Sequence, residues 1–198
     1  MNIERKVYGI LISVIVFAVF AAWISYPKAY IVNESFEDGF GRWTPDADVP
    51  EDPNNPGHFV EWYIKRVSNM SNSGQYSLEF FIDGRQDDGT IWIEQKISVK
   101  RNTVVHVKLS FYLYSEAESF NAIAEVCAYA NVLDAEKETD FADGQLGQAN
   151  QVAGWKRYEY SAAVNSGSND EIWVALGITV LWETQMTYYI DDIEITIQ

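Results

Sequence analysis

The stretch TVVHVKLSFYLY, residues 103–114, alternates between apolar positions and polar or tyrosine positions. A two-residue period is that of a β-strand with one buried face. One side of the stretch consists of Val105, Val107, Leu109, Phe111 and Leu113, and the other of His106, Lys108, Ser110, Tyr112 and Tyr114. We therefore predict a long strand here that buries its apolar side in a core.

Similar patterns recur through the remainder of the chain from residue 29 onward. Further strands are predicted at residues 75–82, 91–99, 122–132, 155–164, 172–181 and 188–197. Turn-rich stretches separate them. Residues 44–57 hold four of the five prolines and cannot form a central strand, and the polar stretch 134–154 is long for a loop. No sustained helical period appears, so the sequence predicts one all-β domain, a sandwich or barrel, over residues 29–198.

Residues 1–28 form a separate segment. Tyr8 to Tyr26 contains nineteen residues without a charge. As a helix rising ~1.5 Å per residue it reaches roughly 28 Å, close to the hydrocarbon thickness of a bilayer. Arg5 and Lys6 precede it, and Trp23 lies near its far end, where amphipathic rings favour the membrane interface. We predict a cytoplasmic stub and a transmembrane signal anchor, with the domain on the extracytoplasmic side of the cell membrane.

A cleavable signal peptide is the alternative. Val19-Phe20-Ala21 is an acceptable small-residue cleavage site, and cleavage there would release a secreted domain. The apolar stretch is longer than a usual signal-peptide core of about 7–15 residues, which favours the anchor.

Charge and composition exclude several functions. The net charge is −15, and the segment before Tyr30 is positive, so the domain itself is more acidic still. Such a field repels phosphate backbones and argues against nucleic-acid binding, although a saline habitat would also explain it. Cys127 is the only cysteine and there are two histidines, which excludes an intrachain disulfide and argues against a Cys- or His-rich metal centre.

Acidic residues stand near both ends of the domain, in Asn33–Gly39 (NESFEDG) and in Tyr188–Ile195 (YYIDDIEI). By alternation Asp191 shares a side with the isoleucines that follow it, which makes it an inward-pointing carboxylate that is costly to bury without a partner. If the first and last strands are neighbours, Glu37 and Asp191 meet. Carboxylates with backbone carbonyls suit Ca²⁺. The alternative is that Glu37-Asp38-Gly39 is only a turn and that Asp191-Asp192 ends a solvent-facing edge.

Several aromatic residues fall on strand faces that are predicted to point away from the core. Rings beside hydrogen-bonding side chains suit sugars, whose C–H faces stack on them. Tyr and Trp are also favoured in strands for packing alone, so each residue taken singly is weak support. The candidate ligand-binding residues are Trp92, Tyr112, Tyr114, Glu125 and Tyr129.

No enzymatic site emerges from the sequence. There is no phosphate-binding glycine loop, no nucleophile elbow and no recognisable arrangement of Ser, His and Asp. Two carboxylates at a glycosidase separation carry no information in so acidic a chain. We expect a protein that is not an enzyme.

The order of these motifs resembles the carbohydrate-binding modules with a galactose-binding-like jelly roll, the type associated with xylanases and cellulases. The resemblance covers nearly all of residues 30–198. It is carried by 33–39 followed by Trp43, by 73–78 (SGQYSL), by 92–95 before a strand ending Ser110-Phe111, by Trp155 with Tyr158, and by 189–193 (YIDDI).

The resemblance implies a two-sheet antiparallel jelly roll, no catalysis, and a structural Ca²⁺ whose ligands correspond to Glu37 and Asp191. The sequence departs from the family in carrying a membrane segment and no fused catalytic domain. We therefore expect a non-catalytic, cell-surface domain that binds a polysaccharide or glycan. The alternative is a structural or adhesive membrane-anchored ectodomain that uses the jelly roll for protein–protein contacts in a surface assembly.

Overall fold

The computed structural model describes residues 30–83, 89–121, 123–181 and 185–198. Among these residues it contains eleven strands and one short 3₁₀ helix. The elements are β1 (Tyr30–Glu34), β2 (Thr44–Asp48), β3 (Trp62–Val67), β4 (Ser77–Asp83), β5 (Gly89–Ser98), β6 (Val104–Ser115), β7 (Ala124–Asn131), η1 (Glu138–Gly144), β8 (Gln145–Gln148), β9 (Gly154–Asn165), β10 (Glu171–Val180) and β11 (Gln185–Ile197).

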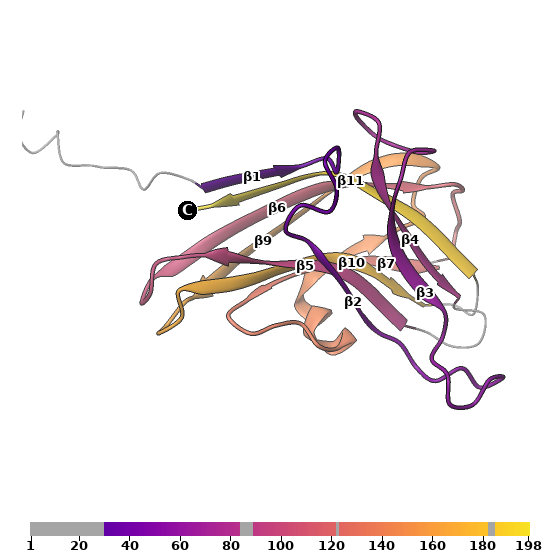
Figure 1. The fold of residues 1–198 in the computed structure, drawn as a ribbon, viewed down its shortest axis with the longest axis horizontal. Helices are drawn as coiled ribbons and strands as arrows, with labels where there is room; N and C mark the ends of the chain where they lie inside the picture. The colour runs from indigo at the N-terminus through magenta and orange to yellow at the C-terminus, as the bar shows by residue number, and fades with distance from the viewer. Residues whose placement is uncertain (1–29, 84–88, 122, 182–184) are drawn as a thin grey trace, which may run out of the picture.

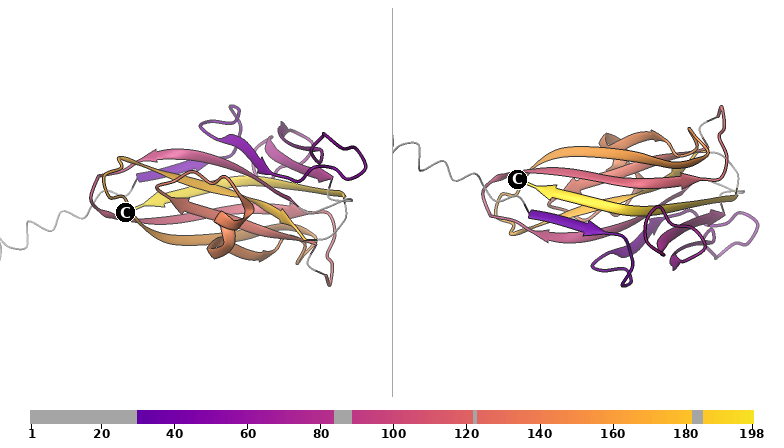
Figure 2. Two further views of the ribbon diagram at one scale, coloured as in Figure 1. Left: turned by 90° about the horizontal axis from the view of Figure 1, so that it is seen from below. Right: turned by 90° about the horizontal axis from the view of Figure 1, so that it is seen from above.

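The strands form two antiparallel sheets that face each other. Sheet A has the order β3-β4-β11-β6-β9, with β1 also paired to β11, and sheet B has the order β2-β5-β10-β7-β8. Figure 1 shows the two layers, with β1, β11 and β6 above β5, β10 and β2. Figure 2 (right) looks onto sheet A, where β11 lies between β1 and β6. This is the predicted all-β, two-sheet antiparallel sandwich.

The core lies between the sheets and follows the alternation seen in the sequence. The inward side chains of β6 are all buried: Val105, Val107, Leu109, Phe111 and Leu113. On β4 they are Leu78, Phe80 and Ile82. Because successive strand residues point to opposite faces, the alternate residues of β6, from His106 to Tyr114, point outward.

The predicted strands are confirmed, and four strands are added. β1, β3 and β8 carry patterns too short to predict, and β2 includes Pro45. Pro45 is tolerated because β2 is an edge strand of sheet B, where one row of backbone groups needs no partner.

The first and last strands are neighbours, as the calcium hypothesis requires, because Glu34 on β1 pairs with Ile193 on β11. The alternation along β11 is interrupted by a bulge between Asp191 and Glu194 opposite β6, where Asp192 has a φ of 50°. Ile190 and Ile193 therefore both face the core. The assignment of Asp191 to the isoleucine side is wrong, because the bulge shifts the phase.

The predicted membrane anchor lies in residues 1–29, outside the described residues. Within the described part of the chain, no helix is long and apolar enough to cross a membrane.

Candidate functional site

The outward face of sheet A carries a row of aromatic side chains that crosses three strands. Tyr114 on β6 pairs with Tyr189 on β11 and with Trp155 on β9, so the three residues stand on one face in register. The ring centroids of Tyr114 and Trp155 are 5.4 Å apart at an interplanar angle of 61°, and those of Tyr114 and Tyr189 are 6.0 Å apart at 73°. Edge contacts of this kind fix ring orientation. We call these three residues the aromatic row.

The same face continues onto β4 and β3 with further rings and a buried acid. The rings of Tyr63 and Phe81 stack at 4.7 Å. The Tyr63 hydroxyl donates to Glu79 Oε1 at 2.9 Å, and Lys65 Nζ lies 2.7 Å from the same oxygen. Glu79 pairs in register with Tyr189, so this network extends the aromatic row from β9, β6 and β11 onto β4 and β3.

Two hollows lie along the strand direction on either side of the aromatic row. The first, of about 510 Å³, lies at the end of the strands. It is lined by Glu79, Thr187 and Tyr189 with Ser115 and Glu116, and also by the core residue Tyr188 and by Ile123 and Asn150 next to the strands of sheet B. The second, of about 290 Å³, is lined by Lys108, Ser110, Arg157, Glu159, Glu194 and Thr196. Both combine hydrogen-bond donors with carboxylate acceptors.

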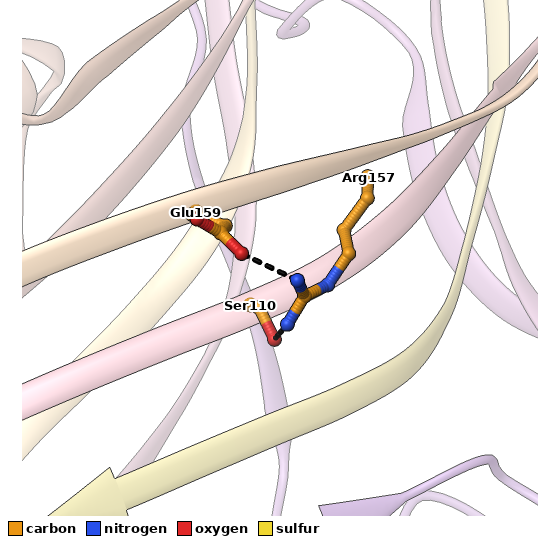
Figure 3. Close-up of polar contacts among 3 residues, drawn as sticks. All are labelled: Ser110, Arg157 and Glu159. Carbon is orange, nitrogen blue, oxygen red and sulfur yellow. Dashed lines mark hydrogen bonds and ion pairs between the residues drawn. The ribbon is translucent and has the colours of Figure 1, made fainter.

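Arg157 organises the polar side of the second hollow. Its guanidinium donates to Ser110 Oγ at 2.9 Å and forms an ion pair with Glu159 (Figure 3). Arg157 also pairs in register with Tyr112, so a half-buried ring stands beside a fixed guanidinium. A ring next to fixed donors is the combination that sugar binding uses.

The five predicted ligand-binding residues divide between opposite faces of the sandwich. Tyr112 and Tyr114 lie half-buried on the outward face of sheet A. Trp92, Glu125 and Tyr129 lie on the outward face of sheet B, away from the core residues of β5 and β7. The structure therefore does not bring the five residues together into one site.

Two of those residues are also covered. Trp92 is 0% exposed, and Tyr129 is buried beside it, because Phe141 of η1 lies over both rings at centroid distances of 5.2 and 5.8 Å. Figure 2 (left) shows η1 lying across the outside of sheet B. Gly144 permits this approach, since a Cβ there would lie 1.7 Å from Ala128 O. Trp92 and Tyr129 are thus a second small core and not a surface for stacking.

In the covered cluster the Trp92 and Tyr129 polar atoms are hydrogen-bonded, and a buried acid lies beside them. Trp92 Nε1 donates to Glu94 Oε2 at 2.9 Å, and the Tyr129 hydroxyl donates to Leu133 O at 2.8 Å. Burial raises the pKa of Glu94 to about 7, and the nearby Asp134 carboxyl adds to the rise. Burial also raises the pKa of Asp134. Each of the two carboxyls therefore stays protonated up to a higher pH than a separate, solvated carboxyl would.

Glu37 and Asp191, the predicted calcium ligands, hold the same loop between β3 and β4. Glu37 Oε1 accepts hydrogen bonds from Gln75 N and Tyr76 N at 2.9 and 3.0 Å. Asp191, which is 0% exposed, accepts from Asn72 N and Ser73 N through Oδ2 at 2.8 and 3.1 Å. Asp191 Oδ1 accepts from Asp192 N at 2.8 Å.

The pKa values of these two acids shift in opposite directions because backbone donors dominate at the exposed Glu37 and burial dominates at Asp191. The Gln75 and Tyr76 N–H groups lower the pKa of the exposed Glu37 carboxyl. Burial raises the pKa of Asp191, and the hydrogen bonds from Ser73 and Asn72 oppose the rise.

An arginine stands beside this corner. Arg66 Nε donates to Phe36 O and Arg66 Nη2 donates to Glu37 O, both at 2.5 Å. The Arg66 guanidinium carbon lies 3.2 Å from the Tyr76 ring centroid, and its charge contributes to the lowered pKa of Glu37. The positive charge at this corner thus comes from a side chain.

Glu37 Oε1, both Asp191 carboxylate oxygens and the Phe36 and Glu37 carbonyls are engaged with N–H donors in this arrangement. Ca²⁺ takes six to eight oxygen ligands, usually with several carboxylates. Within the described ranges, no group of three or more His, Cys, Asp and Glu residues is placed to hold a metal ion. As arranged here the corner does not fit the ion, and the calcium site remains a prediction from the sequence.

Sequence reasoning missed Trp155 and Tyr189. Trp155 was expected in the core or at the end of a strand; it lies near the start of β9, and strand pairing, which no pattern revealed, brings it beside Tyr114. Tyr189 was read only as part of the acidic end motif, although its position before the bulge puts it on the outward side.

No protein-family model matches the sequence, and no curated protein matches it. Solved structures with a similar fold include the N-terminal tandem of CBM22 modules of Xyn10C from Paenibacillus barcinonensis, at a TM-score of 0.50 and 17% identity over 84% of this chain and 50% of that one. The CBM22-1 xylan-binding domain of the same protein gives 0.49 and 19% over 85% and 95%. The K1 cleaved adhesin domain of Lys-gingipain from Porphyromonas gingivalis W83 gives 0.48 and 14% over 84% and 97%. The similarity at these identities is one of fold: the chain has the jelly-roll sandwich of carbohydrate-binding modules.

Proposed function

We propose that this is a non-catalytic carbohydrate-binding domain and that the outward face of sheet A is its binding surface. The observation that carries the proposal is the aromatic row, which stands in register across three strands with fixed edge contacts: Tyr114 and Trp155 are half-buried, and the buried Tyr189 packs edge-on against Tyr114. Sugars present C–H faces that stack on such rings, while their hydroxyls bond to neighbouring polar groups. Both kinds of group are present on this face.

The dimensions of the face favour an extended glycan over a single sugar. The two hollows lie on opposite sides of the aromatic row, one reaching Ser115 of β6 and the other Lys108 of the same strand. Seven residues of antiparallel strand span about 24 Å. A chain of several sugar units laid along β6 would contact both hollows and cross the rings between them.

The charges on the face favour a neutral glycan. Glu79 stands next to Lys65, and Glu159 next to Arg157, so two acids on this face each have a cation beside them. The chain as a whole carries a net charge of −15, which repels anionic polysaccharides at long range. Locally balanced donors and acceptors suit uncharged hydroxyls.

The proposed location is the outside of the cell, with the domain tethered by its N-terminal segment. The support is the uncharged, nineteen-residue stretch from Tyr8 to Tyr26 with Arg5 and Lys6 before it. A tether on this side would present the sheet A face to glycans of the cell's surroundings.

A protein-binding role in a surface assembly is the second candidate, and the observation that favours it is the edge strand β9. β9 has twelve residues and, among the described strands, pairs within its sheet only with β6. Exposed edges of this length can pair with another chain. Its outward side, however, carries Arg157 and Glu159 beside the exposed Lys108 of β6, and such charges oppose edge-to-edge association.

Screening the full-length chain on a broad array of polysaccharides and oligosaccharides tests the proposal. We expect binding to one or more neutral polysaccharides, stronger for long oligomers than for short ones. If no glycan binds and the protein instead associates with itself or with other surface proteins through β9, the assembly role replaces it.

A further inference from the structure

The chain between β7 and β8, residues 132–144, crosses the outside of sheet B and includes η1. It reaches the opposite edge strand of that sheet, where Glu138 N donates to Asp48 Oδ2 of β2 at 2.9 Å. The chain then returns to β7, with which β8 pairs. Figure 2 (left) shows this crossing. We call residues 132–144 the strap.

The strap covers a small hydrophobic cluster that is separate from the core between the sheets. It contributes two side chains to this cluster, Ala135 and Phe141, and sheet B supplies the others. The members from sheet B are Trp92, Cys127, Tyr129 and Ala175, and none of them belongs to the main core. A segment held by so few apolar contacts can open locally while the two sheets stay packed.

Three carboxyl groups converge beneath the strap. Glu94 of β5 is 5% exposed, although it lies on the outward side of sheet B. Asp134 of the strap lies beside it, and Asp46 of β2 pairs in register with Trp92, two residues before Glu94. The negative charges of Asp134 and Asp46 both oppose ionisation of Glu94 and raise its pKa.

Little positive charge faces these acids. Lys96 lies on the same side of β5, but its Nζ stands over the Trp173 ring, 4.8 Å from the centroid, and 3.8 Å from Glu171 Oε2. The residues that continue the row of Glu94 across the sheet, Thr44, Ala175 and Tyr129, carry no charge. The strap itself contains five acids and one lysine: Asp134, Glu136, Lys137, Glu138, Asp140 and Asp143.

A proton relieves the repulsion between Glu94 and Asp134. Asp134 Oδ1 is buried and has no hydrogen-bond partner among the described residues. A protonated carboxyl can donate to a neighbouring carboxylate, whereas two carboxylates repel each other. The covered arrangement therefore favours the protonated pair, and ionisation of both acids works against the contacts that hold the strap down.

We propose that the strap is a pH-sensitive cover, closed while Glu94 and Asp134 hold a proton between them and loosened when both are ionised. Its opening exposes the Trp92 and Tyr129 rings and the Cys127 thiol on the outward face of sheet B. This device lies on the opposite sheet from the proposed glycan surface and does not depend on sugar binding.

The direction of the response follows from which state of the strap binds the proton more tightly. Under the closed strap the pKa of Glu94 is about 7, and in the open state the carboxyl is hydrated and its pKa returns toward 4.5. The open population therefore rises with pH between these two values and levels off above them.

Cys127 provides the test, because it is the only cysteine of the chain and is 0% exposed within the covered cluster. The full-length chain is labelled with dithiodipyridine at a series of pH values, and each rate is divided by that of the urea-unfolded chain at the same pH. We expect this ratio to rise roughly tenfold or more across the window in which Glu94 titrates. Glu94→Gln keeps an acceptor for Trp92 Nε1 but cannot ionise, and should flatten the profile, whereas Glu171→Gln changes an exposed acid of the same sheet and should preserve it.

Two further comparisons separate opening of the strap from unfolding of the whole domain. Phe141→Ala removes the ring that covers Trp92 and should raise labelling at acid pH, whereas Phe59→Ala removes a ring that is 73% exposed on the β2–β3 connection and should label like the wild type. Urea below the unfolding transition should change the labelling rate little, because opening the strap exposes little surface. A pH-independent ratio in the wild type, equal profiles for the wild type and Glu94→Gln, or a rate that climbs with urea as steeply as global unfolding would each overturn the proposal.

Discussion

Tyr114 and Trp155 stand opposite each other on β6 and β9, with ring centroids 5.4 Å apart in an edge arrangement. Neither ring belongs to the core between the sheets. Their contact fixes the outer end of the aromatic row on a rigid pair of long strands, and a rigid platform loses little entropy when a ligand binds.

The ring contact should be measurable in the free protein. We expect Tyr114→Ala and Trp155→Ala to be coupled by about 0.5–1.5 kcal/mol in the free energy of unfolding. Urea denaturation of the two single variants and the double variant closes the cycle. Strictly additive losses would show that the rings do not stabilise each other.

Stability should fall as pH rises through the range in which Glu94 titrates. Burial raises the pKa of this carboxyl from 4.5 to about 7, so the folded protein retains a proton there that the unfolded chain has already released. Between those two values each rise in pH therefore favours unfolding. Glu94→Gln, which keeps the hydrogen-bonding shape without the titration, should show a flatter melting temperature over this window. Equal slopes for wild type and variant would contradict the account.

Asp191 should be needed to hold the β3–β4 loop. Its two oxygens accept three backbone N–H donors, and the amide of Asn would turn a donor toward one of them. We expect Asp191→Asn to lower the free energy of unfolding by about 1–3 kcal/mol. Asp170→Asn is the control: it weakens an exposed ion pair with Arg101 and should leave the free energy of unfolding nearly unchanged. Similar losses for both variants would contradict the role of the loop contacts.

The corner beside Glu37 should depend on Arg66 and not on calcium. Arg66→Met removes the donors to Phe36 O and Glu37 O and should lower the free energy of unfolding by about 1–3 kcal/mol, while Arg101→Met should have little effect. Chelator and added Ca²⁺ should leave the wild-type melting temperature unchanged. A melting temperature that climbs with Ca²⁺ concentration would instead confirm the calcium site predicted from the sequence, since a ligand of the folded state stabilises it by mass action.

Much of the fold could be predicted because the long strands alternate cleanly. The pattern of residues 103–114 identified both the strand and its buried side, and the same rule held for β4, β5 and β9. It failed at Asp191, where a bulge shifts the phase of β11. A bulge depends on the partner strand, so a period counted along one strand does not reveal it.

The residues of the proposed binding surface could be predicted only in part, because a side chain that faces outward from a sheet is not always exposed. Trp92 faces outward, yet Phe141 covers it, and nothing in the polar stretch from 134 to 154 signalled that a helical turn would fold back over sheet B. Tyr114 was identified correctly as outward-facing, but its neighbours Tyr189 and Trp155 became visible only with the strand order.

The central claim is tested most directly by affinity electrophoresis of the wild type, Tyr114→Ala and Phe59→Ala through gels that contain a polysaccharide bound on the array. The account predicts that Tyr114→Ala weakens binding by roughly tenfold or more while remaining folded, and that Phe59→Ala is retarded like the wild type. Retardation of Tyr114→Ala equal to that of the wild type would contradict glycan binding on the outward face of sheet A.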